Sequence, residues 1–249
     1  MARPRGTVAD FTDPYIGTFT PPPPAGDGVC DVCHGAPGPG FSRCYSCWQT
    51  MRQVTHPIEL VVPISLYEIP GQLHHVLRNY KDGYTEEIRS ALRPRVTALL
   101  WRFLSTHEDH IVEVAGAEWD IITSVPSSGP REGQHPLERA IGLARPLAEK
   151  YQQTLERGDG PLGHNLASDT GYVVNGDVNG TNVLLVDDTF TSGARVQSAA
   201  SALALAGANV IAAVPIGRVI NPGFNAATTA LWETARDTRF DFDVCCLEH

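Results

Sequence analysis

Two neighbouring acids and a run of hydroxyl residues directly follow a short apolar stretch of the chain. Val183–Val186 is wholly apolar, which predicts a strand buried on both faces of a sheet. Asp187 and Asp188 come next. Ligands of open α/β sheets bind at the carboxyl ends of the strands. The acid pair is therefore the first candidate for a functional site.

The residues after the acids suit a phosphate group. They are Thr189, Phe190, Thr191, Ser192 and Gly193, and a helix is expected from there to about residue 206. The free N–H groups of a helix N-terminus, together with hydroxyl donors, can hold a phosphate. Two carboxylates facing that phosphate would repel it, so we expect them on sugar hydroxyls or a hydrated Mg²⁺ nearby. Ribose 5-phosphate fits this order of charges, and the structural alternative is an ordinary turn whose Asp and Thr residues cap the helix.

A second strand predicted at 120–126 ends in a comparable loop. It is followed by Ser127, Ser128, Gly129 and Arg131. Small residues let the backbone approach an oxyanion, and a guanidinium can make a bidentate contact with it. A plain strand-to-helix turn has a similar sequence. Because the chain also contains the acid pair, we interpret this segment as a second ligand loop, which binds pyrophosphate.

Four cysteines near the N-terminus have the spacing C-x₂-C-x₁₀-C-x₂-C. They are Cys30, Cys33, Cys44 and Cys47, with glycines in the intervening turn. Two such pairs present four thiolates to a tetrahedral ion, and they predict a structural zinc ribbon. The alternatives are a redox C-x-x-C, which normally accompanies a thioredoxin-like βαβ unit, and replacement of one thiolate by His34. The adjacent thiols Cys245 and Cys246 are interpreted as buried or incidental.

Charge and hydropathy restrict the partners. The net charge of −9 argues against nonspecific binding of nucleic acid, unless Arg89, Arg93, Arg95 and Arg102 form a local basic stripe. The sequence has no apolar run long enough for a membrane span and no apolar signal core at its N-terminus, so a cytoplasmic protein without membrane contact is expected. Six cysteines then indicate metal ligands or thiols rather than disulfides.

Three regions are predicted along the chain. Residues 1–27 contain four consecutive prolines, which predict an extended or disordered arm. The zinc ribbon is expected over residues 28–56, and the main α/β domain over residues 57–249. Within that domain we expect a helix over 86–104 that Pro94 kinks or splits, one helix over 137–151, and a last strand over 240–247.

The segment Val183–Gly193 resembles the phosphoribosyl pyrophosphate (PRPP) motif of type I phosphoribosyltransferases. The cysteines, Tyr80–Gly83 and the Val125-Pro126 pair occur in an order similar to that of ComF-like proteins, a subgroup associated with competence and DNA uptake. The resemblance implies a mainly parallel sheet flanked by helices, with a small N-terminal zinc ribbon. It assigns Asp187 and Asp188 to the ribose and residues 189–193 to the 5-phosphate. ComF-like proteins carry several arginines after the Val-Pro pair where this chain has one, which predicts a weaker hold on pyrophosphate.

Two hypotheses of function follow. In the first, the protein binds PRPP with magnesium and transfers phosphoribosyl to an acceptor that the sequence does not identify, with Asp187, Asp188 and Arg131 as catalytic residues and residues 127–129 at the leaving pyrophosphate. In the second, a non-catalytic module senses PRPP or a nucleotide. The zinc ribbon would then serve as an adaptor for a protein partner, or the module would handle single-stranded DNA.

Overall fold

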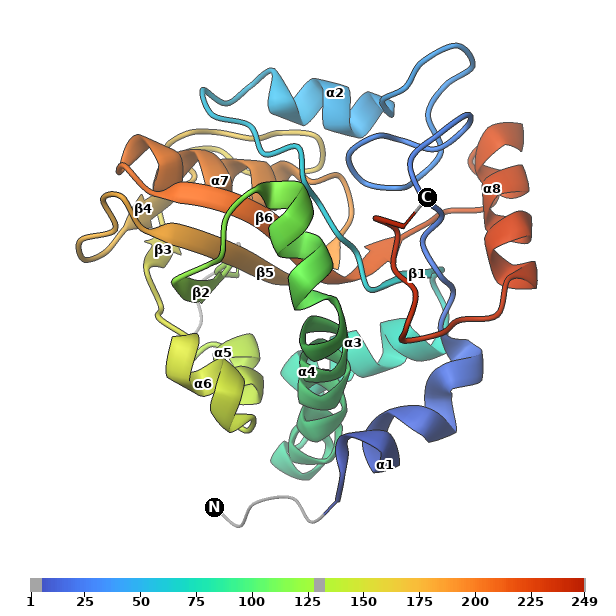
Figure 1. Ribbon diagram of the computed structural model, residues 1–249, viewed down its shortest axis with the longest axis horizontal. Coiled ribbons are helices and arrows are strands. Elements are labelled where there is room, and N and C mark those ends of the chain that lie inside the picture. The colour runs from blue at the N-terminus through green and yellow to red at the C-terminus, as the bar shows by residue number, and fades with distance from the viewer. Residues whose placement is uncertain (1–5, 128–132, 249) are drawn as a thin grey trace.

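A four-stranded parallel sheet forms the centre of the structure, a computed structural model that describes residues 6–127 and 133–248 (Figure 1). The strand order is β1 (Ser65–Tyr67), β6 (Asn209–Val219), β5 (Asn182–Phe190) and β2 (Ile121–Ser124). β5 and β6 are buried over most of their length, as central parallel strands are. The predicted α/β class with a parallel sheet is confirmed.

Helices cover both faces of this sheet (Figure 1). One face packs against α3 (Gln72–Asp82), α4 (Glu86–Ala115), α5 (Pro136–Ile141) and α6 (Arg145–Lys150), and the other against α7 (Ala194–Leu205) and α2 (Tyr45–Met51). Successive residues of a strand point to opposite faces. Leu184 and Val186 of β5 accordingly join the first core, whereas Val183 and Leu185 join the second.

A pair of short strands and one helix lie outside the main sheet. β3 (Leu155–Arg157) and β4 (Tyr172–Val174) pair antiparallel, and the chain between them runs past the end of β5. α8 (Ala226–Asp237) follows β6 and packs through Leu231 and Trp232 near β1.

The N-terminal arm contains helices where an extended or disordered segment was expected. α1 (Val8–Thr12) leads into a 3₁₀ helix (Asp13–Thr18). Thr7 and Asp10 cap α1 reciprocally, a capping-box signal present in the sequence. Arg102 of α4 pairs with Asp13, which fixes the arm against α4.

Helix boundaries differ from the prediction in two places. α4 continues through Pro94 and extends to Ala115, because buried His107 and Ile111 prolong its inward face. The helix predicted over 137–151 is two helices, since α5 ends at Ile141 and α6 starts afresh with Pro146 in its first turn.

The predicted last strand over 240–247 is wrong. This segment consists of turns, and the main-chain N–H of Asp243 bonds to the Asp241 carboxylate at 3.0 Å. Phe240 and Phe242 alternate as in a strand, yet they pack edge-to-face against each other and against Phe19 of the arm.

Candidate functional site

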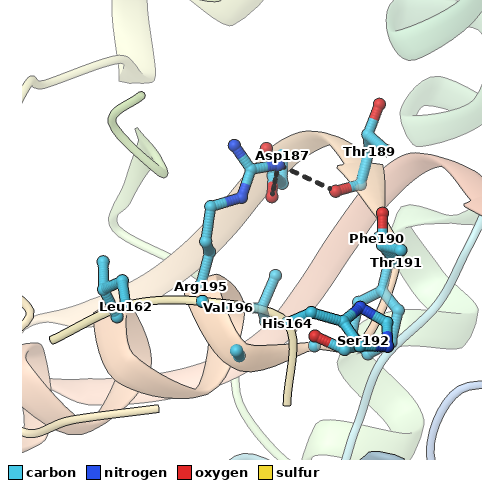
Figure 2. A pocket seen from close by; sticks show the side chains of 12 residues that line it. Leu162, His164, Asp187, Thr189, Phe190, Thr191, Ser192, Arg195 and Val196 are labelled. Atoms are coloured by element: carbon cyan, nitrogen blue, oxygen red, sulfur yellow. Dashed lines mark hydrogen bonds and ion pairs between the residues drawn. The ribbon is translucent and has the colours of Figure 1, made fainter. Parts of the chain in front are cut away.

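A cavity of about 320 Å³ lies at the carboxyl end of β5, where the turn Thr191–Gly193 leads into α7 (Figure 2). Gly193 has φ = 82°, and a Cβ there would lie 2.5 Å from the Phe190 ring, so only glycine fits this turn. No side chain from the described part of the chain caps the N-terminus of α7. The cavity therefore faces unsatisfied N–H groups and the positive end of the helix dipole, which together favour an anion.

The hydroxyl residues of the turn have distinct surroundings. Thr189 accepts a hydrogen bond from the Tyr67 hydroxyl at 3.3 Å. Ser192 accepts from the main-chain N–H of Asn165 at 3.1 Å, and a hydroxyl that accepts still has its own proton to donate. Thr191 is exposed. Leu162 and His164, from the chain between β3 and β4, also line the cavity (Figure 2).

Asp187 lines this cavity and is buried, with 3 % of its surface exposed. Figure 2 shows the guanidinium of Arg195 beside it, 3.3 Å from its carboxylate and 3.1 Å from the Thr189 carbonyl. Burial raises the pKa of Asp187 to about 6, even though Arg195 opposes that shift. The carboxyl group therefore changes charge close to neutral pH.

Asp188 points to the opposite face of the sheet, because it is the next residue of the same strand. Its carboxylate accepts hydrogen bonds from the Tyr80 hydroxyl and the Lys81 ammonium of α3, each at 2.7 Å. Burial works against ionisation, but Lys81, Arg195 and these hydrogen bonds outweigh it and lower the pKa of Asp188. Both acids already have partners within the protein, and their side chains lie on opposite faces of the sheet.

A second cavity, of about 350 Å³, lies on the Asp188 side and is rich in cations that sequence reasoning did not bring together. Lys81 of α3, Arg89 and Arg93 of α4 and Arg139 of α5 line it, with Glu86 as the acid among its lining residues. The Arg93 side chain is 7 % exposed, and its Nε is buried with no hydrogen-bond partner in residues 6–127 and 133–248. Hydrogen bonds from Arg93 and Arg89 lower the pKa of Glu86 to about 2, so Glu86 is ionised. The cavity nevertheless keeps an excess of positive charge.

The second predicted loop is described only at its start. Ser127 lies 3.0 Å from His135 Nε2 through its hydroxyl. Ser128, Gly129 and Arg131 lie outside the described residues.

The four cysteines of the predicted ribbon come together and are buried, with their sulfur atoms within 4.8 Å of one another. Cys33 and Cys44 are 3.7 Å apart. A tetrahedral ion with metal–sulfur bonds of about 2.3 Å places two sulfurs about 3.8 Å apart, so this cluster fits a structural metal such as zinc. His34 Nδ1 donates to the Pro23 carbonyl at 2.9 Å instead of joining the cluster.

Arg218, at the end of β6, connects the cysteine cluster to the turn after β5. It is 9 % exposed and donates to the Thr191 carbonyl at 2.9 Å, with its guanidinium over the Phe190 ring. Burial disfavours its charge, but negative charge on the nearby sulfur atoms of Cys33, Cys44 and Cys47 raises the pKa of Arg218. Gly35 allows this approach, since a Cβ there would meet Arg218 Nη2 at 2.9 Å.

Comparison with protein-family models and with curated proteins found no match to this chain. Across residues 6–127 and 133–248, no helix combines the length and the apolar character needed to cross a membrane.

Proposed function

We propose that the protein binds PRPP, or a related ribose 5-phosphate, across the carboxyl end of β5. The turn Thr191–Gly193 and the N-terminus of α7 would hold the 5-phosphate, because free main-chain N–H groups at a helix N-terminus favour an anion in the first cavity. The observation that carries the proposal is the position of the acids. Asp187 lines this cavity, and Asp188 bonds to Tyr80 and Lys81, which line the cationic one.

The cationic cavity supports the pyrophosphate end of this proposal. Arg89, Arg93 and Arg139 come from two different helices and supply charge that the loop after Val125-Pro126 was expected to lack. Guanidinium groups bind phosphate oxygens in bidentate fashion. Magnesium would enter with the pyrophosphate and neutralise part of its charge.

The acids would bind the ribose hydroxyls between the two anionic ends. A carboxylate has about four lone-pair sites, so one that already accepts two hydrogen bonds can still accept a hydroxyl. In transfer, an acceptor would form a bond to the anomeric carbon while the bond to pyrophosphate breaks. Asp187 and Asp188 would stabilise the positive charge that develops on the sugar, and the arginines the negative charge on the leaving group.

Calorimetry with fragments of the ligand tests this arrangement. Wild-type protein is expected to bind PRPP with Mg²⁺, ribose 5-phosphate alone and pyrophosphate with Mg²⁺. Arg139→Ala should weaken PRPP and pyrophosphate binding about 10- to 100-fold, the worth of one charged hydrogen-bonding group, and leave ribose 5-phosphate unchanged. The matched control is Arg145→Ala, since Arg145 is 81 % exposed on α6 and pairs only with Glu149 among the described residues. Absence of PRPP binding by the wild type would refute the proposal.

Affinity for PRPP is expected to fall as the pH drops below about 6. The raised pKa of Asp187 means that its carboxyl gains a proton in that range and then accepts hydroxyl protons less well. If PRPP binding requires the ionised Asp187 carboxylate, each pH unit below its pKa lowers the affinity about tenfold. The ligand's own phosphate titrates near the same pH, so Asp187→Asn is the control. This variant should keep the part of the pH dependence that comes from the ligand and lose the part that comes from Asp187.

The internal partners of the acids favour a second candidate, a non-catalytic module that senses PRPP or a nucleotide. Lys81 already neutralises Asp188, and neutralised acids stabilise a developing cation less than free ones. Release of pyrophosphate in the presence of bases and amines would identify the enzyme, whereas binding without release would identify the sensor. For the single-stranded DNA version, the stripe is interrupted: Arg95 lies over Tyr15 and Arg102 over Phe242, away from the cavity that Arg89 and Arg93 line.

A further inference from the structure

A second group of metal-ligating side chains gathers where the C-terminal segment meets α4. His107 and His110 come from α4, and Cys245 and Glu248 from the turns after α8. One ligand atom from each of the four lies within 4.8 Å of the others. Cys245 was expected to be a buried or incidental thiol, and it is buried. Its histidine partners lie about half the chain away, so no local spacing in the sequence points to this group.

The distances within this group are close to those of a coordination sphere. Glu248 Oε1 lies 3.4 Å from His110 Nδ1 and 4.0 Å from His107 Nδ1, and Cys245 Sγ lies 3.9 Å from His110 Nδ1. Zinc with bonds of about 2.0–2.3 Å spaces its tetrahedral ligands about 3.3–3.6 Å apart. Small side-chain rotations would therefore bring all four atoms onto one ion.

His107 provides an independent sign of a missing partner. It is 1 % exposed, and among the described residues neither ring nitrogen has a partner that meets distance and angle criteria for a hydrogen bond, although the main chain of Phe242 lies close enough to affect its pKa. A buried polar group without a partner costs about 1–3 kcal/mol, and proteins rarely leave one unsatisfied. An ion pair with Glu248 would explain His110, at 3.4 Å, but at 4.0 Å Glu248 lies beyond hydrogen-bond distance of His107 Nδ1 and leaves His107 Nε2 without a bond among the described residues.

The backbone holds these four side chains close to one another. His107 and His110 are three residues apart, so they share one face of α4. The main-chain N–H of Cys245 donates to Glu248 at 3.1 Å, which holds the carboxylate beside the thiol. Cys245 and Glu248 also border a groove of about 750 Å³, and His110 is 46 % exposed, so an ion has a path of entry.

We propose that His107, His110, Cys245 and Glu248 form a second site for a zinc-like divalent metal, separate from the four-cysteine cluster. A set of two imidazoles, one thiolate and one carboxylate suits zinc and its neighbours, whereas Mg²⁺ and Ca²⁺ prefer oxygen ligands alone. The ion fastens the C-terminal segment to α4. This inference does not depend on the proposed ligand of the β5 site.

Metal content of the full chain tests the proposal. After incubation with excess zinc and desalting, the wild type should carry about two zinc ions per chain by elemental mass spectrometry and Cys245→Ser about one. Cys246→Ser is the matched control, because Cys246 is an equally buried neighbouring thiol outside the group; it should keep both ions. His110→Ala changes a more exposed ligand and should also lose one ion, with far-ultraviolet circular dichroism confirming the fold.

Cobalt substitution identifies which site is empty. The Cys245→Ser protein should lose the absorption of a mixed nitrogen–sulfur site and keep the stronger charge-transfer bands of four thiolates. One zinc ion per chain in the wild type would overturn the proposal. Two ions retained in both Cys245→Ser and His110→Ala would overturn it as well.

Discussion

Replacing Cys33 by serine is expected to remove the metal from the four-cysteine cluster and to destabilise the protein by several kcal/mol. Structural zinc contributes about 10–16 kcal/mol in isolated zinc-finger peptides. The four cysteines of the cluster also belong to the apolar core beneath α7, whose other contacts do not involve the ion. We therefore expect a loss of about 3–5 kcal/mol, comparable to that of a broken buried charge network.

The charge of Arg218 adds to this effect. A divalent ion with four thiolates carries net negative charge, and Arg218 is the buried cation beside it. Without the cluster, that guanidinium is buried with main-chain carbonyls as its partners among the described residues. The turn that it holds through Thr191 should loosen, and amide hydrogen exchange at residues 190–193 should become faster.

Urea unfolding measures the loss of stability. Cys246→Ser is the control, because it exchanges the same atoms at an equally buried thiol outside the cluster. If Cys33→Ser retains its metal and unfolds at the same urea concentration as Cys246→Ser, the cluster is not a structural metal site.

The sequence predicted the local features of the β5 site and missed its three-dimensional setting. The apolar run, the glycine and the helix after it were correct because each depends on neighbouring residues only. β5, however, continues past the acids to Phe190, since its parallel pairing with β6 extends to Arg218. Within a strand, Asp187 and Asp188 must face opposite ways, so a ribose that contacts both acids has to lie across the end of β5, which the sequence alone does not indicate.

The cationic cavity could not be predicted because α3, α4 and α5 contribute to it from distant positions. Lys81, Arg93 and Arg139 have no mutual spacing that a motif could capture. The same is true of His107 and Cys245. The four cysteines of the predicted ribbon, by contrast, lie close in sequence, and their spacing alone predicted the cluster that the structure contains.

Replacing Asp188 by asparagine is expected to weaken PRPP binding more than about 100-fold and to destabilise the protein as well. Loss of hydrogen bonds between a charged carboxylate and ribose hydroxyls accounts for the affinity, at about 1.5–3 kcal/mol for each bond. Lys81 loses its charged partner, which should lower the free energy of unfolding by about 3 kcal/mol. This value is at the low end for a buried ion pair, because the Lys81 side chain is 22 % exposed. The lowered pKa of Asp188 gives the same sign: the stabilisation is present above the ordinary carboxyl pKa and is lost as the pH falls.

Lys81→Met in the Asp188→Asn background separates the two effects. The double variant removes both buried charges, so it should recover most of the stability that the single variant loses, as measured by urea unfolding. Its PRPP affinity should stay low, because neither the carboxylate for the ribose nor the ammonium beside the cationic cavity is restored. Recovery of binding together with stability would mean that Asp188 serves only as the counterion of Lys81, and the ribose would then have to be bound from the Asp187 side alone.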